Sequence, residues 1–527
     1  MFRRKKLLGS TAMISAAVVL AGCSSLTGGS EENDEPIVVG TTSEPTVLDP
    51  AGAWDGSWEL YRNVYRTLLY FPKSSGTPKP DAAQECSFTD NSSQVYRCTL
   101  KDGLTFEGGN ALDAQAVKHS FERTLAIKDP GGPGPLLESI DRIETSGENT
   151  VVFHLKKSNA TFPLILATPA ASLVDPATFP ADKLLQSRDI VASGPYKLAA
   201  YTPGERAELV RNDQYEGPAK LRNEAVTIRY FGDSGPMLKA LEDEEIDLTY
   251  RGLAPQQITA IQDGESSNRN ITLHEATGTE IRYLVFNPAF DAVAEPAVRQ
   301  SIAQLIDRKT LVREVYQRTA EPLYSMVPGG ITGHTSAYFD QYGEPNQDKA
   351  EQLLADAGIS TPVRLKLWYS TDRYGTITAA EFEEIRRQLN ESGLFDVEIE
   401  GRTWEDFQEG IENGEYAVFG RGWFPDFPDA DNYIGPFVGA NTSVGVPYED
   451  ERLTGELLPD SRRQSVRAAA GETLKEAQRI LAEDARLLPL WQGRLYLAAH
   501  NEIAGIEWTI DASTIMHLWE LHRKESW

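Results

Sequence analysis

The stretch VRLKLWYSTDRYGTITAAEFEEIRRQLNESGLFDVEIEGRTWEDFQEGIENGEYAVFGRGW, residues 363–423, decides the fold. Its first eight residues and the later segment FDVEIEG have the pattern of strands, and the mostly apolar run YAVFGRGW (416–423) predicts a buried strand. An amphipathic helix is predicted over 379–390 and a short helix over 404–413, each closed by a glycine. This β-α-β-α-β order predicts a parallel sheet with helices on its faces.

The rest of the chain extends this pattern. The chain has 527 residues, which is too many for a single core, so two or more lobes are expected. A helix followed by a strand is predicted over 236–250, whereas 86–100 and 151–155 have the pattern of strands joined by hairpins. The sequence therefore predicts mixed α/β lobes that carry a smaller β-rich appendage.

The segment GWFPDFPDADNYIGPF (422–437) follows the third predicted strand, and its two prolines exclude a helix or a central strand. Asp426 lies just past the carboxyl end of that strand, where open α/β sheets bind ligands. A carboxylate among aromatic rings is poorly solvated and needs a partner. That partner is either a local arginine, such as Arg421, or a cation that a ligand brings. The surrounding aromatic residues are Trp423, Phe424, Phe427 and Tyr433.

The first residues indicate export. Four basic residues precede an uncharged, mostly apolar run over 7–21, which is too short to span a bilayer as a stable helix. The run ends in Leu-Ala-Gly-Cys, which resembles a bacterial lipobox with Cys23 as the lipidated residue; an ordinary signal peptide with a chance cysteine is the alternative. We expect a signal peptide over 1–22 and a lipidated, flexible tether over 23–35, because the latter is small, polar and acidic.

The other two cysteines, Cys86 and Cys98, flank a turn-like center between extended segments. An oxidising, extracytoplasmic location predicts a disulfide that closes this hairpin, and two buried free thiols are the alternative. The formal net charge of −27 at pH 7 argues against a nucleic-acid partner, which needs a basic surface.

Metal ions and cofactors are not predicted. The seven histidines form no pair with ligand spacing. Asp429 and Asp431 faintly resemble a calcium loop, but Ile434 and Ala440 occupy the positions that need glycine and glutamate. We expect these two aspartates to cap the segment that begins near Asn432.

A catalytic site is not predicted either. GDSGP (232–236) resembles the nucleophile segment of trypsin-like proteases, but it leads into a helix within an α/β order, which favours a helix cap. GGPGP (131–135) lacks the Lys-Ser/Thr of a phosphate loop, which favours a rigid turn. A secreted hydrolase stays the alternative from another functional class.

Six blocks in the same order are similar to the extracytoplasmic solute-binding proteins of family 5, the dipeptide-, oligopeptide- and nickel-binding proteins of ABC importers. The blocks are LDP with NVYRTLLYF (48–71), YRCTLKDGLTFEGGNALDAQAVKHSFERTL (96–125), SGPYKLAAYTPGERAELVRNDQYEG (193–217), YLVFNPA with AVRQSIAQLIDRKTLV (283–312), KAEQLLADAGI (349–359) and EAQRILAEDARLLPLW (476–491). The resemblance covers nearly all of the chain after the tether.

This resemblance implies a two-lobe periplasmic-binding-protein-like fold of type II, cluster C, with an extra β-rich domain on the first lobe. Lobe I is expected over 36–58, 192–282 and 500–527, the extra domain over 59–191, and lobe II over 283–499. The resemblance also implies a monomeric peptide receptor, not an enzyme, that is anchored outside the cell membrane by its lipid and delivers ligand to an ABC permease. A receptor for oligosaccharides, with Trp54, Trp58, Trp368 and Trp423 as stacking surfaces, or for a nickel complex is the alternative.

The family's peptide-binding members imply the site. Their first aspartate in the Trp-x-x-Asp-Tyr-x-Asp-Pro-type segment, here Asp426, pairs with the α-ammonium of the peptide, and the peptide backbone pairs with the preceding strand. Phe427 and Ala430 depart from the usual tyrosine and proline. Arg373 is the candidate for the ligand's carboxylate, with a solvated surface arginine as the alternative. The predicted ligand-binding residues are Asp426, Trp423, Gly422, Phe424, Phe427, Arg373, Tyr283 and Asn287.

Overall fold

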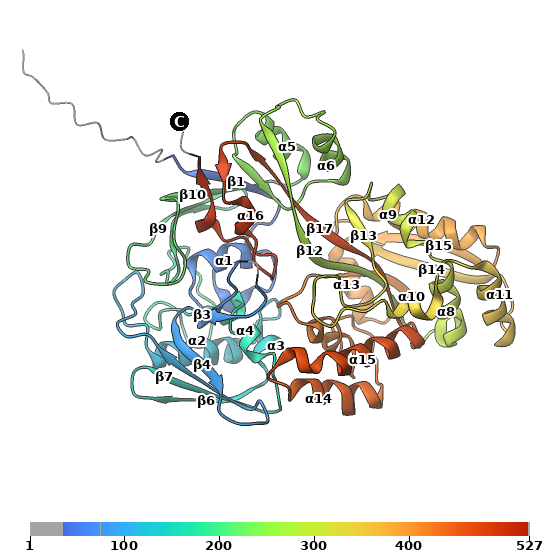
Figure 1. Ribbon diagram of the computed structural model, residues 1–527, viewed down its shortest axis with the longest axis horizontal. Helices are drawn as coiled ribbons and strands as arrows, with labels where there is room; N and C mark the ends of the chain where they lie inside the picture. The colour runs from blue at the N-terminus through green and yellow to red at the C-terminus, as the bar shows by residue number, and fades with distance from the viewer. Residues whose placement is uncertain (1–34, 74, 525–527) are drawn as a thin grey trace, which may run out of the picture. The chain divides into compact units, whose positions relative to one another are not determined.

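The computed structural model describes residues 35–73 and 75–524 (Figure 1). The predicted signal peptide, the lipidated Cys23 and all of the predicted tether except Glu35 lie outside the described residues. Within the described residues, no helix is both long enough and apolar enough to cross a membrane.

The stretch 363–423 folds as its pattern predicts. Strands β14 (Val363–Ser370), β15 (Phe395–Arg402) and β16 (Val418–Trp423) form a sheet in which β14 pairs in parallel with both others. Helices α12 (Thr378–Glu391) and α13 (Trp404–Glu412) connect them. Val418 packs in the same cluster as α12 and its neighbour Phe419 in the cluster of α13, so the two helices cover opposite faces of the sheet.

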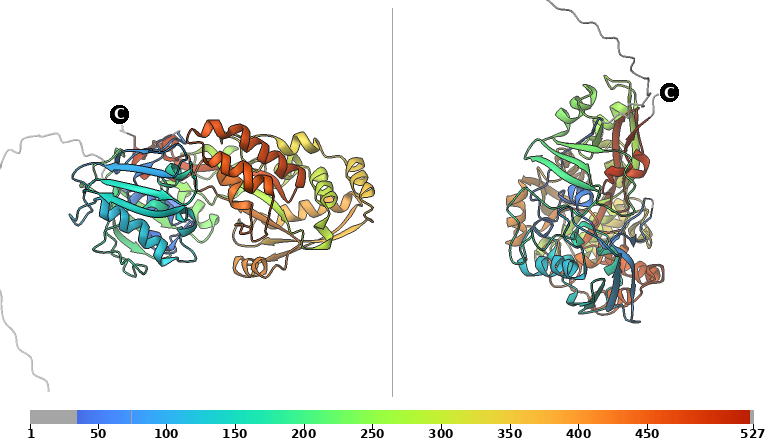
Figure 2. Two further views of the ribbon diagram at one scale, coloured as in Figure 1. Left: turned by 90° about the horizontal axis from the view of Figure 1, so that it is seen from below. Right: turned by 90° about the vertical axis from the view of Figure 1, so that its left-hand side faces the viewer.

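This unit is one end of an 11-stranded sheet that runs through the molecule (Figures 1 and 2). The strand order after β15, β14 and β16 is β12 (Ile271–Phe286), β17 (Leu487–His500), β11 (Leu248–Tyr250), β1 (Ile37–Thr41), β10 (Ala225–Tyr230), β9 (Arg206–Arg211) and β8 (Tyr196–Thr202), with β13 (Ala320–Pro322) on β17. The mixed α/β class predicted from the sequence is therefore confirmed.

The two long strands β12 and β17 pair in antiparallel fashion from Ile271↔His500 to Val285↔Leu487. The register shifts between Thr277 and Ile281 on β12. Gly278 lies in this interval, and a Cβ added there would lie 2.2 Å from the carbonyl oxygen of Gly493 on β17. A glycine is therefore needed at this point of close contact between the two strands.

Buried side chains form separate clusters along this sheet. Lobe II contributes two clusters, and lobe I and the extra domain have clusters of their own. Leu495 and Leu497 of β17 pack in the lobe I cluster, although the predicted boundaries place them in lobe II. The residue boundaries of the three parts stay a prediction.

Helices cover both lobes and the extra domain. Those in lobe I are α5 (Ser234–Glu242), α6 (Pro255–Gln262) and α16 (Ile506–Thr509), and those in the extra-domain range are α1 (Trp58–Val64), α2 (Ala114–Ile127), α3 (Gly134–Leu137) and α4 (Phe162–Ile165). Those in lobe II, besides α12 and α13, are α7 (Asp291–Ala294), α8 (Pro296–Leu305), α9 (Arg308–Glu314), α10 (Ala337–Tyr342), α11 (Gln347–Asp356), α14 (Leu458–Arg462) and α15 (Gly471–Asp484). The Asp233 carboxylate accepts from the Gly235 N–H, so GDSGP is the cap of α5, as predicted.

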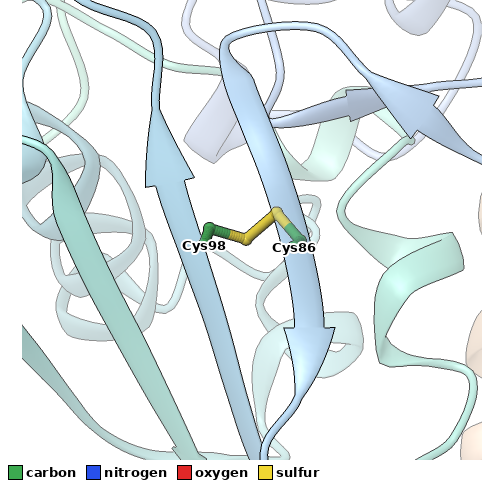
Figure 3. The surroundings of a disulfide bond; sticks show 2 residues. All are labelled: Cys86 and Cys98. Carbon is green, nitrogen blue, oxygen red and sulfur yellow. A yellow bond between two sulfur atoms is a disulfide. The ribbon is translucent and has the colours of Figure 1, made fainter.

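The extra domain contains a four-stranded antiparallel sheet. Its order is β4 (Ala83–Phe88), β5 (Val95–Leu100), β7 (Thr150–Leu155) and β6 (Ile140–Ser146). Cys86 and Cys98 are directly opposite each other on β4 and β5 and form a disulfide (Figure 3). The predicted hairpin disulfide is therefore confirmed.

Removing this disulfide should lower the stability of the extra domain. The bond closes a loop with a sequence separation of 12 residues, which corresponds to about 3 kcal/mol of the free energy of unfolding in the chain-entropy description. We expect the double variant Cys86→Ala/Cys98→Ala to lose this amount in urea unfolding, and reduced wild-type protein to behave like the variant. Equal midpoints for the oxidised and reduced wild-type protein would contradict the prediction.

Candidate functional site

The side chain of Asp426 lies just beyond the end of β16 and is 4% exposed. Its Oδ1 accepts a hydrogen bond from the Trp54 indole N–H at 2.6 Å, and its Oδ2 accepts one from the Asn432 amide at 2.8 Å. The Asn432 side-chain oxygen accepts in return from the Asp426 backbone N–H at 2.9 Å. Both oxygens of a buried carboxylate are thus held by neutral donors.

No basic side chain within the described residues forms an ion pair with Asp426. Arg421, the local alternative, donates instead to the Gln408 side chain and to the Ser443 carbonyl. Burial raises the pKa of Asp426 to about 6, although the hydrogen bonds from Asn432 and Trp54 act in the opposite direction. Ionised Asp426 therefore carries a negative charge that no basic side chain in the described part of the chain neutralises.

The other two aspartates of the loop have protein partners. Asp429 accepts from the Asp431 N–H and caps the short helical turn η3 (Ala430–Tyr433), as predicted, and it also pairs with Arg467 at 2.8 Å. The prediction that Asp431 caps this segment as well was wrong, because Asp431 lies inside the turn and its carboxylate pairs with Arg462. Asp431 forms two hydrogen bonds with the Arg462 guanidinium, at 2.8 and 2.9 Å. Burial acts to raise the pKa of Asp431, but the charge and hydrogen bonds of Arg462, together with the Arg467 charge and the Ser461 hydroxyl, outweigh burial and lower it.

The aromatic residues next to Asp426 have different environments. Trp423 is half-buried, and its indole N–H donates to the Asn432 side chain at 3.2 Å. Phe424 is 40% exposed, and the guanidinium groups of Arg251 and Arg282 lie 5.9 and 5.3 Å from its ring center. Phe427 is buried in the hydrophobic cluster of the extra domain, so it does not line an open cleft.

The carboxyl end of β16 has one edge without a described strand partner. β14 pairs with Val418 and Phe419 only, whereas β12 pairs along the whole strand as far as Trp423. A Cβ added at Gly422 would lie 2.3 Å from an Arg282 guanidinium nitrogen, so a larger residue at this position would displace the Arg282 side chain.

Three predicted residues lie apart from Asp426. Arg373 is exposed, and its guanidinium lies 5.2 Å from the Trp404 ring center. Tyr283 is fully buried in β12 beside Phe437, and Asn287 hydrogen-bonds to the Ala289 N–H. The structure brings none of the three into hydrogen-bond contact with Asp426.

Sequence reasoning missed both residues that hold the Asp426 carboxylate. Asn432 is six positions downstream, where an asparagine in a loop with an aspartate is a usable signal. Trp54 is 372 positions upstream and was considered only as a surface for sugar rings. No local pattern could have joined it to Asp426.

A cavity of 1330 Å³ lies beside the loop, and Asp426 does not line it. Pro428 and Asp429 line it, together with residues 75–78 of the extra domain and 273–277 of β12. Among the described residues, no group of three or more histidine, cysteine, aspartate or glutamate side chains is placed to hold a metal ion.

The sequence profile of the family described as "Bacterial extracellular solute-binding proteins, family 5 Middle" matches residues 77–444. The chain belongs to this family. A family 5 solute-binding protein is an extracytoplasmic transport receptor and not an enzyme. The resemblance predicted from the six sequence blocks is thereby confirmed.

Named relatives of this family 5 protein cover most of its length. It is 25% identical over 486 residues to the "Probable D,D-dipeptide-binding periplasmic protein DdpA" of Escherichia coli K12, which covers 89% of this chain and 90% of that protein. It is 24% identical over 485 residues to the glutathione-binding protein GsiB of the same strain, with 89% and 91% covered.

Solved structures show the same fold. The periplasmic binding protein DppA from Helicobacter pylori, in complex with the peptide STSA, superposes with a TM-score of 0.76 at 22% identity, covering 93% of this chain and 98% of that one. The two-lobe periplasmic-binding-protein-like fold predicted from the sequence is therefore confirmed.

Proposed function

We propose that this protein binds peptides by their amino terminus between its two lobes and delivers them, as a monomer, to an ABC import permease. The observation that carries the proposal is the buried Asp426 carboxylate, which has neutral donors only among the described residues. The α-ammonium of a peptide supplies the cation that this carboxylate lacks. The names of the relatives, which refer to dipeptides, glutathione and a peptide complex, support this ligand class.

The backbone of the ligand has a strand edge to pair with. Beyond Phe419, β16 has no described partner on the side of β14. A peptide that runs along this edge would form main-chain hydrogen bonds, which are indifferent to its side chains. We therefore propose broad side-chain tolerance, with Gly422, Trp423 and Phe424 as the contact residues.

The other end of the ligand and the membrane anchor are also proposals. Arg373 lies on an exposed loop after β14, with its guanidinium over the Trp404 ring, and it is our candidate to take the ligand's carboxylate in a bidentate arrangement. Tyr283, in β12, and Asn287, just after it, stay predicted ligand-binding residues. Lipidation at Cys23 would hold the receptor at the outer face of the cell membrane.

An oligosaccharide receptor needs aromatic faces that are open to sugar rings. Trp58 is buried and donates to the Ala53 carbonyl at 3.1 Å. Trp368 stacks on Tyr416, with the ring centers 4.6 Å apart. These two positions therefore favour packing over sugar binding, and no described contact favours the alternative function.

Blocking the amino terminus of the ligand should test the proposal. Acetylation removes the positive charge, so we expect N-acetylated oligoalanines to bind at least about tenfold more weakly than the free peptides, which corresponds to about 1.4 kcal/mol. Isothermal titration calorimetry at pH 7.5 measures both affinities, and peptides amidated at the carboxyl terminus serve as the control. Equal affinities of the free and acetylated peptides would shift the assignment to a ligand without an amine.

A further inference from the structure

Three consecutive residues of lobe II contact other parts of the molecule. Asp426 accepts from Trp54 of lobe I, and Phe427 is 4% exposed within the hydrophobic cluster of the extra domain. Pro428 packs against Gly76 of the extra domain, where an added Cβ would lie 3.2 Å from the proline ring. The turn that carries the proposed ligand anchor is therefore also the turn that joins lobe II to lobe I and to the extra domain.

The residues that follow this turn are also connected to the extra domain, through ion pairs and hydrogen bonds of the segment at the end of α14. Asp429 and Asp431 pair with Arg467 and Arg462, near the end of α14. The Arg462 carbonyl accepts from the Ala160 N–H of the extra domain at 2.8 Å, and the Arg463 carbonyl accepts from the Ser93 hydroxyl at 3.1 Å. Figures 1 and 2 show α14 and α15 next to the extra domain. The loop after β16 and the end of α14 thus both contact the extra domain, and ion pairs connect them to each other.

We propose that Trp54 is a positioning residue for the ligand's ammonium group, and that the turn 426–428 makes ligand anchoring and closure of the lobes a single event. This inference rests on the proposed function. Trp54 belongs to lobe I and Asp426 to lobe II, so their hydrogen bond exists only when the two lobes are in contact. A ligand that binds Asp426 while this bond is made binds the closed form more tightly, and this difference shifts the population toward closure.

The carboxylate has hydrogen-bonding capacity left for a ligand. An ionised carboxylate accepts about four hydrogen bonds, two at each oxygen. Trp54 occupies one position on Oδ1 and Asn432 one position on Oδ2, so each oxygen keeps one position for an ammonium donor. The indole N–H also stabilises the ionised form, which is the form that attracts an ammonium.

The charged and titratable groups around Asp426 are otherwise engaged. Burial raises the pKa of Tyr433, and its hydroxyl donates to the Thr279 carbonyl. Asp429 and Asp431 are paired with arginines, as described above. On the Trp54 side, Asp55 accepts from the Thr46 hydroxyl and the Ser57 N–H. Burial also raises the pKa of Glu59 to about 7, and its partner Arg251 lies over the Phe424 ring. A change in binding near pH 6 is therefore assigned to Asp426 only if Asp426→Asn removes it.

The variant Trp54→Phe tests the inference, because it keeps an aromatic ring and removes the N–H donor. A hydrogen bond to a charged group corresponds to about a tenfold change in affinity. We expect Trp54→Phe to bind free oligoalanines of two to six residues about tenfold more weakly, and their N-acetylated forms unchanged. The pH at which affinity for the free peptides is half lost should move upward, since the carboxylate has lost a stabilising donor. Trp508→Phe, at an exposed tryptophan of lobe I, is the matched control.

The variant Phe427→Ala tests the second part of the inference, the role of the turn 426–428 in closure of the lobes. Small-angle X-ray scattering of the ligand-free full chain should give a larger radius of gyration, and affinity should fall by one common factor for free and acetylated peptides, without a change in the pH midpoint. Phe427→Leu keeps a large apolar side chain, so its radius of gyration and its peptide affinities should be close to those of the wild-type protein.

The outcomes separate the inference from the proposed function. A wild-type protein that binds free and acetylated peptides equally contradicts the proposed function, and the inference fails with it. If the wild-type protein prefers free peptides, the proposed function stands. The inference about Trp54 is then overturned if Trp54→Phe loses the same factor of affinity for free and acetylated peptides, or if its pH midpoint is unchanged. A Phe427→Ala variant with unchanged scattering and affinity overturns the role of the turn in closure.

Discussion

Asp426→Asn is expected to weaken the binding of a peptide with a free amino terminus by roughly 2–5 kcal/mol, the range for truncating one partner of a buried charge pair. The asparagine keeps the size of the side chain but loses the negative charge that attracts the ammonium. It also replaces one acceptor oxygen with an NH2 donor, so one of the two hydrogen bonds from Trp54 and Asn432 loses its acceptor atom. Calorimetry with the same oligoalanines measures the loss.

The pH dependence of binding gives this prediction a second readout. Because the pKa of Asp426 is raised to about 6 in the ligand-free protein, affinity for a free peptide should fall as the pH drops below this value. The amino terminus of a peptide has a pKa near 8 and stays protonated throughout, so the loss belongs to the carboxylate. Asp426→Asn should bind weakly and without this transition.

Stability should change in the opposite direction with pH. A carboxyl whose pKa is higher in the folded than in the unfolded state stabilises the fold below its unfolded pKa, and this contribution is lost as the pH rises through the folded value. The ligand-free wild-type protein should therefore gain stability relative to Asp426→Asn between pH 7 and pH 4. Asp213→Asn, the same change at an exposed position, is the control for both measurements. Unchanged peptide affinity in Asp426→Asn would refute the role of this carboxylate.

Arg123→Met is expected to lower the free energy of unfolding by about 3–5 kcal/mol, because it leaves a buried carboxylate without its cation. Arg123 on α2 donates through both terminal nitrogens to Asp49, at 2.7 and 2.8 Å, and neither side chain is more than 1% exposed. Asp49 also accepts from the N–H groups of Ala51 and Leu185. The pair therefore joins the extra domain to lobe I.

Urea unfolding measures this loss, and a double-mutant cycle shows whether it belongs to the pair. The variant Asp49→Asn/Arg123→Met should be less destabilised than the sum of its single variants, since each single change already breaks the same interaction. Lys118→Met, on the exposed face of α2, is the matched control and should change stability by less than about 0.5 kcal/mol. A loss in Arg123→Met no larger than that of the control would contradict the prediction.

The parts of this molecule that a single stretch of sequence determines could be predicted. The alternation of 363–370 and 395–401 and the helix between them depend on local periodicity, and the structure has these elements within two residues of the predicted bounds. The position of Asp426 at the sheet edge follows from the same unit, because a residue that follows a parallel strand lies at its carboxyl edge. The hairpin disulfide could be predicted for the same reason, because its two cysteines are separated by only 12 positions in the sequence.

Contacts between distant segments could not be predicted. Trp54 and Asp426 are 372 residues apart, and neither neighbourhood carries a pattern that refers to the other. Phe427 stands in an aromatic-rich loop, which suggested a ligand-facing wall, but tertiary packing places it in the extra domain. β17 gives side chains to the clusters of both lobes, so a boundary read from hydrophobic patterns cannot divide it correctly.

The continuity of β12 and β17 through both lobes limits how the receptor can move. Two hydrogen-bonded strands resist sliding and stretching, but a ladder interrupted between Thr277 and Ile281 yields to bending. At Gly278 the backbone of β12 lies too close to Gly493 of β17 for any side chain. Because this pair of strands continues from one lobe into the other, a change in the orientation of the lobes would have to bend the pair rather than separate it.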